Sequence, residues 1–219
     1  MRMPVAVFAF FCSAAAVAQQ NDWIIVPSAR LGPITAATSR QAVVRLFGRG
    51  NVNDQDVDTG EGPEPATVVF GKDPSASLAI LWEDNRLDRV LVCFRTEFGP
   101  CKWHTKDGVT LGTTLPKLEI LNGRPFAIEP WGSDVGGNIT SWRGGKLAGE
   151  FGDSGRFHLL LTLNWQLRST GPTPQQKQAQ DEIERLGRDP QSSDSPVRKL
   201  QPEVTRVLFL FPSKDRASK

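Results

Sequence analysis

The sequence predicts an α+β fold in which two similar modules, each a short helix followed by an antiparallel β-meander, pack as one body. The first observation is a phrase that occurs twice: Ile34-Thr35-x-Ala37-Thr38-Ser39 through Leu46-Phe47-Gly48 returns 75 positions later as Val109-Thr110-x-Gly112-Thr113-Thr114 through Leu121-Asn122-Gly123. The second is that short strand-like runs follow each copy. The alternative is chance similarity between two capped helices, because Ser/Thr caps and Gly stops recur in unrelated proteins.

The first module is expected over residues 19–105. Thr38 or Ser39 caps its helix, and Gly48 ends it because glycine tolerates a left-handed backbone. The buried face of this helix consists of Val43, Leu46 and Phe47. Three apolar or alternating runs then predict a three-strand meander at residues 66–70, 78–82 and 89–94.

The second module is expected over residues 106–170 and repeats this order. Thr113 or Thr114 caps its helix, Pro116 occupies the tolerated first turn, and Gly123 ends it. Strand-like runs follow at residues 126–129, 138–142 and 158–165.

Residues 171–219 are expected to complete the domain. Thr173 and Pro174 open a surface helix that Gly187 ends, and a helical turn follows at residues 196–200. The run at residues 204–211 is so apolar that it is expected to return to a sheet as a strand.

Residues 1–18 have the features of a removable signal peptide. Arg2 gives the basic start, and Ala16-Val17-Ala18 gives the small-residue cleavage site after an apolar run. That run is shorter than the about 20 apolar residues that span a bilayer. We therefore expect cleavage near Ala18 and a soluble periplasmic or secreted protein, without a lipid anchor because Cys12 follows the bulky Phe11.

The balance of charge excludes some partners. The chain has 26 basic and 24 acidic residues, and cleavage would remove only Arg2 among them, so the mature protein is close to neutral. Nucleic-acid-binding proteins usually carry a basic stripe that neutralises phosphates. The sequence therefore predicts neither nucleic-acid binding nor membrane insertion, and no cofactor.

Cys93 and Cys101 are the two cysteines that remain after cleavage. In an oxidising compartment a closely spaced pair most simply forms a disulfide. Closing so short a loop contributes about 2.5 kcal/mol by the chain-entropy estimate. The alternative, a free nucleophilic thiol, would have only His104 as its base.

At the two repeated phrases and between them, the chain resembles an uncharacterised family of exported bacterial proteins. The matching stretches are residues 26–35, Gly60-Glu61-Gly62, residues 108–113, residues 121–126, and Ser192-Ser193-Asp194 with Leu200-Gln201-Pro202. This resemblance implies a fold and a compartment, and no activity. More distantly, the paired modules are similar to those of β-lactamase-inhibitor protein and of small outer-membrane assembly lipoproteins, which implies protein binding by analogy of fold.

Two patterns suggest catalysis, and each lacks a required part. Gly152-Asp153-Ser154-Gly155 matches the surroundings of the nucleophile in trypsin-like proteases, but the chain is too short for a double-barrel protease, so a turn between strands is expected. His104, Asp107 and Asp134 share only their residue types, and two histidines cannot build a three-histidine zinc site. We predict no catalytic and no metal-binding residues.

Alternating carboxylates at Asp54, Asp56 and Asp58 are typical of calcium-binding loops. The glycine of such a loop comes one position late here, and Pro65 stands where an EF-hand has glutamate. The expected structure is a solvated acidic loop, and a loose calcium site stays open as the alternative.

Trp131 opens a glycine-rich loop, and Trp142 follows within the reach of a hairpin. Tryptophan is favoured at contact hot spots, so Trp131, Asp134 and Trp142 form a candidate binding surface, to which Glu61 and its glycines are added. The alternative is that the six tryptophans of a chain without tyrosine fill the core.

These observations predict an exported, non-catalytic binding protein of the bacterial envelope, whose partner is another envelope or secreted protein. Binding is expected through loops and the concave face of the sheet. The alternative is a hydrolase that acts on an envelope polymer through acidic residues such as Asp134 or Glu129. Such an enzyme would need a deep pocket with raised carboxylate pKa values.

Overall fold

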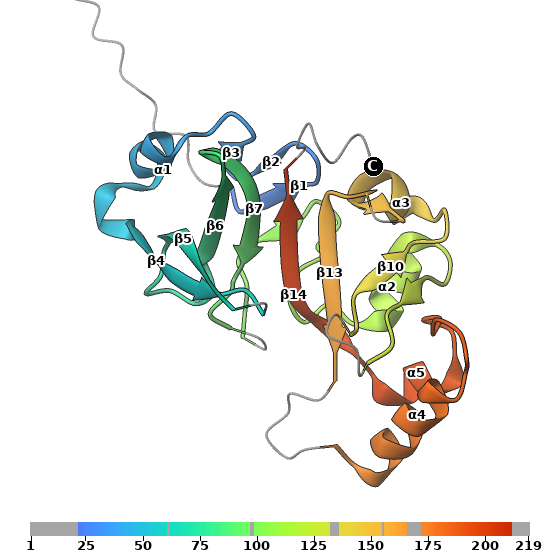
Figure 1. Ribbon diagram of the computed structural model, residues 1–219. Helices are drawn as coiled ribbons and strands as arrows, with labels where there is room; N and C mark the ends of the chain where they lie inside the picture. The colour runs from blue at the N-terminus through green and yellow to red at the C-terminus, as the bar shows by residue number, and fades with distance from the viewer. Residues whose placement is uncertain are drawn as a thin grey trace, which may run out of the picture.

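The computed structural model describes residues 22–60, 62–96, 99–131, 136–154, 156–165 and 172–211. The expected signal peptide lies outside these residues. Within them, helices and mainly antiparallel sheets are mixed along the chain, which confirms the predicted α+β class (Figure 1).

A six-stranded antiparallel sheet forms the centre of the molecule, in the order β13-β14-β7-β6-β5-β4. Its strands are β4 (Val52–Asp58), β5 (Pro63–Val69), β6 (Leu78–Glu83), β7 (Arg86–Val92), β13 (Leu159–Asn164) and β14 (Glu203–Leu210). Strand β14 comes from the C-terminal segment and pairs with both β13 and β7. The prediction that this apolar run returns to a sheet is therefore confirmed.

Strand β4 corrects the expectation of an acidic loop at Asp54 to Asp58. These residues belong to the edge strand of the sheet, and they pair with β5 in regular antiparallel register. The carboxylates stay exposed because they alternate with the side chains that turn the other way, among which Val57 is buried. Charged side chains on an edge strand also discourage pairing with another chain.

The other strands form three small sheets, ordered β3-β2-β1-β8, β10-β9 and β11-β12. They are β1 (Ile24–Val26), β2 (Arg30–Leu31), β3 (Ile34–Thr35), β8 (His104–Thr105), β9 (Ala127–Ile128), β10 (Ile139–Ser141), β11 (Gly152–Asp153) and β12 (Arg156–Phe157). Strands β1 and β8 pair in parallel. A bridge between Asn138 and Thr162 brings the start of β10 beside β13.

Local chemistry explains where several helices begin and end. The helices are α1 (Arg40–Phe47), α2 (Leu115–Asn122), α3 (Lys146–Phe151), α4 (Pro174–Glu184) and α5 (Ser195–Leu200), with a 3₁₀ turn at Arg49–Asn51. Ser39 caps α1 through a bond from Ala42 N–H, and Thr173 forms a capping box with Gln176 at the start of α4. The sequence does not predict α3, which follows the turn at residues 143–145.

The repeated phrase has the same local structure in both places. The equivalent bonds are Thr35 N–H to Thr38 Oγ1 (2.9 Å) with Thr110 N–H to Thr113 Oγ1 (2.9 Å), and Gly48 N–H to Val44 O (2.9 Å) with Gly123 N–H to Glu119 O (2.8 Å). Both copies thus enter the helix through the same threonine turn and leave it through glycine. Duplication of whole modules is a larger claim and stays a prediction.

Beyond these helices, the two halves of the chain continue differently. Helix α1 leads through the 3₁₀ turn into the meander of β4 to β7. After α2, by contrast, α3, β11 and β12 separate β10 from β13, and α4 and α5 separate β13 from β14. Strands β7 and β14 pair inside the large sheet, where β14 is the second strand from the edge formed by β13.

The two faces of the large sheet bury different clusters of apolar side chains. One face belongs to the main core, to which it contributes Val90, Val92, Val207 and Phe209. The other face carries a smaller cluster made of Val57, Ala66, Val68, Ala79, Leu81 and Leu91. We call this second face the concave face, because the sheet curls around it.

Candidate binding site on the concave face

The large sheet curls until its edge strand β4 approaches β14. Arg206 of β14 donates from Nη2 to the carbonyl oxygen of Thr59, the residue that follows β4. These strands are four positions apart in the sheet, about 19 Å if the sheet were flat, which is far beyond the reach of one arginine. Arg206 lies two residues from Leu208, so the enclosed face is the one that carries the smaller cluster.

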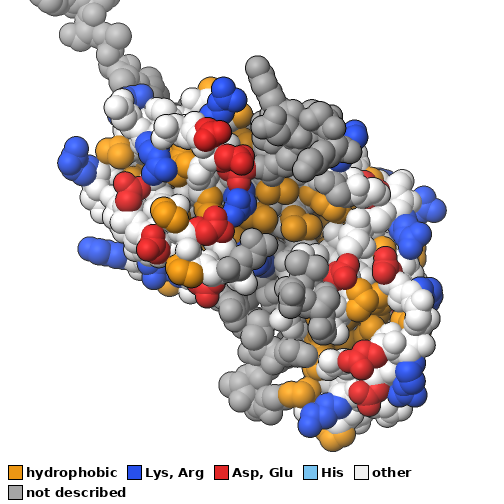
Figure 2. Space-filling view, viewed as in Figure 1, with side chains coloured by type: hydrophobic (Ala, Val, Ile, Leu, Met, Phe, Trp, Pro, Cys, Tyr) orange, Lys and Arg blue, Asp and Glu red, His pale blue; other side chains and the backbone are white. Residues whose placement is uncertain are grey.

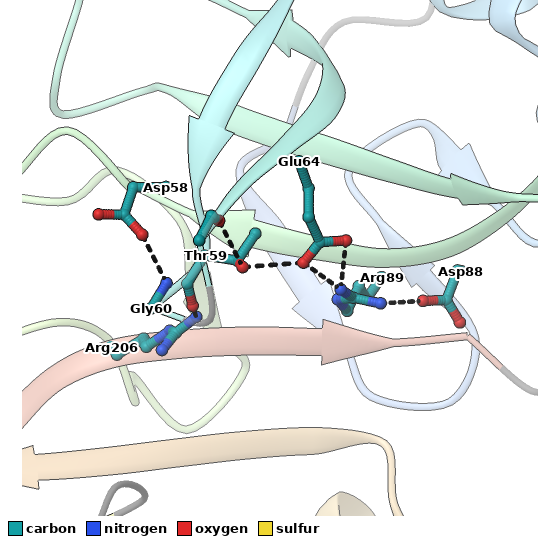
Figure 3. Close-up of polar contacts among 8 residues, drawn as sticks. Asp58, Thr59, Gly60, Glu64, Asp88, Arg89 and Arg206 are labelled. Atoms are coloured by element: carbon teal, nitrogen blue, oxygen red, sulfur yellow. Dashed lines mark hydrogen bonds and ion pairs between the residues drawn. The ribbon is translucent and has the colours of Figure 1, made fainter.

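The end of β4 that reaches over the sheet to β14 is called the overhang, and a chain of polar contacts stabilises it (Figure 3). Thr59 Oγ1 donates to Glu64 Oε1 at 2.8 Å, and Arg89 Nη2 donates to both carboxylate oxygens of Glu64 at 2.8 Å. Arg89 Nη1 also donates to Asp88 Oδ2 at 2.7 Å. Charge-assisted bonds of this kind are stronger than neutral ones, and here they join the end of β4 to β5 and β7.

The concave face contains an open pocket of about 430 Å³. Its lining comes from the end of β4 (residues 58–60), from the end of β7 and the turn after it (residues 91–94 and 96), and from β13 and β14 (residues 162, 164, 205 and 206). This volume lies within the range of about 300–1,000 Å³ that is usual for small-molecule sites.

Next to the pocket lies a group of partly exposed leucines, Leu160, Leu208 and Leu210, which we call the leucine patch. The strand register places Leu160 opposite Leu208, and Leu208 opposite the buried pocket residue Leu91. Figure 2 shows hydrophobic side chains over β13 and β14, with acidic and basic side chains beside them. An apolar centre with a polar rim is typical of surfaces that bind other molecules.

The predicted pair Cys93 and Cys101 forms a disulfide, and this disulfide supports one wall of the pocket. Cys93 follows β7 with a left-handed backbone (φ 50°), which turns the chain so that Phe94 and Thr96 line the pocket. Cys93 N–H donates to Ser77 O at 2.7 Å. Directly after Cys101, Lys102 N–H donates to Ser75 O at 2.8 Å. The turn before β6 therefore holds both ends of the bridged loop.

Two of the predicted binding residues, Trp131 and Trp142, lie in the main core. Their exposed fractions are 5% and 0%. Trp131 Nε1 donates to Leu163 O at 2.9 Å, and Trp142 packs against Phe126 and Phe151. Burial removes both from the candidate contact surface and matches the alternative that tryptophans fill the core. Glu61 and Asp134 lie outside the described residues.

The serine of the protease-like pattern lies in a turn, as predicted. Ser154 follows β11 and precedes β12, and the two strands pair as a tight hairpin. Asp153 Oδ1 accepts bonds from Trp142 N–H at 2.9 Å and from Ser154 N–H at 2.8 Å. This carboxylate therefore organises the hairpin backbone.

The residues proposed for acid–base or metal chemistry do not form a shared site in the described part of the chain. His104 Nδ1 lies 2.8 Å from the backbone oxygen of Lys102, two residues earlier in the chain. Burial raises the pKa of the Glu150 carboxyl, and the negative charge of Asp107 raises it further. Among the described residues, no three His, Cys, Asp or Glu side chains gather as metal ligands. Glu129 is not among the residues that line the pocket.

Sequence reasoning missed Thr59 and Arg206, the two residues that close the overhang. They are 147 positions apart, so no local pattern connects them. The one available signal is that a charged Arg206 interrupts the apolar run of β14. Such an interruption indicates that the strand has one face outside the main core.

Fold and site together define an α+β protein whose curled antiparallel sheet carries a pocket and a leucine patch on its concave face. In the residues described, every helix is too short or too polar to cross a membrane. Comparison of the chain with protein-family models, with curated proteins and with solved structures found no match. Function is therefore inferred from the geometry of the concave face.

Proposed function

We propose that the protein is a non-catalytic binding protein of the bacterial envelope, and that it holds a protein or another envelope component on its concave face. The observation that carries this proposal is the leucine patch beside the pocket. Strands β13 and β14 present both features, and β14 is paired on both sides. A surface held this rigidly loses little conformational entropy when a partner binds.

The chemistry of the pocket supports binding more than catalysis. The titratable side chains in its described lining, apart from the bridged cysteine, are Asp58 and Arg206. Covalent catalysis needs a nucleophile within hydrogen-bond reach of a base, and neither His104 nor His158 is among the described lining residues. No observation favours the alternative hydrolase, because Glu129 does not line this pocket.

The compartment is supported by two independent features. The Cys93–Cys101 disulfide is compatible with an extracytoplasmic location, since disulfides persist in oxidising compartments. Residues 1–18 have the composition of a signal peptide. The resemblance to exported bacterial proteins adds to the same proposal.

Site-specific photo-crosslinking tests the binding surface. A benzophenone amino acid is placed at Leu208 on the concave face, and in a matched variant at Ile120 of α2, whose side chain is 73% exposed. Both proteins are produced in the native host, irradiated, purified and weighed by intact mass spectrometry. We expect a defined adduct at Leu208 and none at Ile120.

Two outcomes would contradict the proposed function. One is the absence of an adduct at Leu208 when thermal unfolding shows that the variant is folded. The other is equal labelling at both positions, which would indicate non-specific encounters.

A further inference from the structure

Three of the four threonine hydroxyls in the described pocket lining have already used their hydrogens within the protein, and the fourth, Thr96, accepts a bond from Gly99 N–H. Thr162 Oγ1 donates to Asn138 Oδ1 at 2.6 Å, and Thr59 Oγ1 donates to Glu64 Oε1 at 2.8 Å. Thr205 Oγ1 makes a longer bond to Thr162 O at 3.4 Å. A threonine hydroxyl has one hydrogen and two acceptor lone pairs. The oxygens of Thr59, Thr162 and Thr205 can therefore still accept a bond, so a ligand that bonds to them has to bring the donors.

The charges of the described lining balance each other. Asp58 is its acidic residue and Arg206 its basic residue, and both already bond to the backbone of the β4 end, at Gly60 and Thr59. A strongly anionic ligand would approach Asp58, and a strongly cationic ligand would approach Arg206. Attraction to the opposite charge offsets repulsion from the like charge in each case, so the lining gives an ion no net electrostatic advantage over a neutral ligand.

One wall of the pocket is apolar. Leu91 near the end of β7 contributes to it, and so does Phe94 in the turn that follows. Phe94 is partly exposed, and the guanidinium of Arg95 lies 5.1 Å from the centre of its ring. The ligand therefore needs an apolar surface as well as several hydroxyl or amide donors.

We propose that this pocket binds a neutral saccharide. Sugar hydroxyls would donate to the oxygens of Thr59 and Thr162, and the C–H face of a sugar ring would lie against Leu91 and Phe94. This inference rests on the proposed function, because it assigns a ligand class to the same concave face.

Titration of the ¹⁵N-labelled, oxidised mature protein followed by NMR tests the inference. The probes are maltotriose, cellotriose and tri-N-acetylchitotriose, with trigalacturonate as an anionic comparison. Each is added to about 10 mM, which detects even a Kd of about 1 mM. We expect at least one neutral trisaccharide to shift the amide signals of Phe94, Thr162 and Thr205, and trigalacturonate to bind more weakly.

Matched substitutions locate the contact. Thr162→Val keeps a β-branched side chain but removes the acceptor oxygen, and it should weaken binding about fivefold, the worth of one net hydrogen bond. Thr35→Val on β3, outside the pocket lining, should leave binding unchanged. Because Thr162 also bonds to Asn138, Thr205→Val serves as a second pocket variant if Thr162→Val does not fold.

The inference is overturned if no neutral saccharide shifts the pocket signals, if trigalacturonate binds more tightly than all of them, or if Thr35→Val weakens binding as much as the pocket variants do. A crosslink at Leu208 without saccharide binding would sink this inference alone and leave the proposed function in place. Loss of both would remove the concave face as the binding site.

Discussion

At the scale of single residues, Gly137 shows how tightly the chain packs where Trp131 enters the core. Its backbone is left-handed (φ 84°), and an added Cβ would overlap the carbonyl oxygen of Leu163 and lie 2.7 Å from Trp131 Nε1. That carbonyl accepts the indole bond of Trp131. Gly137→Ala should therefore lower the free energy of unfolding by about 3 kcal/mol, measured by urea denaturation.

Gly149 provides the matched control for this prediction. It lies inside α3 with open space around the position of a Cβ. Gly149→Ala should stabilise the protein by about 0.5–1 kcal/mol, because alanine loses less backbone entropy in a helix. Similar effects of the two substitutions would contradict the packing described at Gly137.

The carboxylate of Asp194 makes stability depend on pH. Arg188 donates to both of its oxygens at 2.9 Å and lowers the pKa of Asp194 below its usual 3.8; burial opposes this shift, and Gln191 N–H adds to it. Because the unfolded state binds the proton more tightly, the contribution is present above pH 3.8 and is lost as pH falls through the folded pKa. Asp194→Asn should lower stability at about pH 7 and flatten its acid dependence. The midpoints of urea unfolding of the wild-type and variant proteins, measured from neutral to acidic pH, test this prediction. It would be refuted if the two midpoints fell in parallel with pH.

At the scale of elements, the sequence predicts those whose limits are set by neighbouring residues. Helices α1 and α4 begin at Ser39 and Thr173, where the cap is a local hydrogen bond. Strand β4 is not predicted as a strand because its exposed carboxylates are acceptable only on a sheet edge, and the edge is a property of the sheet. The burial of Trp131 and Trp142 also depends on the assembled fold, so periodicity alone could not reveal it.

The loop between Cys93 and Cys101 is the element on which the shape of the pocket wall depends. The double variant Cys93→Ala, Cys101→Ala should lose about 2.5 kcal/mol of unfolding free energy in the chain-entropy estimate. The two ends of the loop remain bonded to Ser75 and Ser77, so the variant should still fold cooperatively. Intact mass before and after reduction verifies the bridge in exported material. An unchanged mass there would contradict it.

At the scale of the whole molecule, the concave face exists only because distant segments meet. The end of β4 and the C-terminal strand β14 close the overhang through Thr59 and Arg206. The sequence could predict that β14 joins a sheet, from its apolar composition, but not that the sheet curls. Curling depends on twist accumulated over several strands, which no local pattern records. The pocket could therefore be found only in the assembled fold.

The position of β14 between β13 and β7 predicts that the C-terminal segment is required for folding. Removal of residues 171–219 would take Val204, Val207 and Phe209 out of the main core and leave β7 and β13 without their shared partner. The truncated chain should show no cooperative thermal transition by circular dichroism. Full-length Val207→Ala is the control: it should keep a cooperative transition while losing about 2 kcal/mol, because it deletes buried methyl groups and leaves the strand in place. Cooperative melting of the truncated chain would mean that residues 171–219 are an appendage, and that the sheet does not need β14.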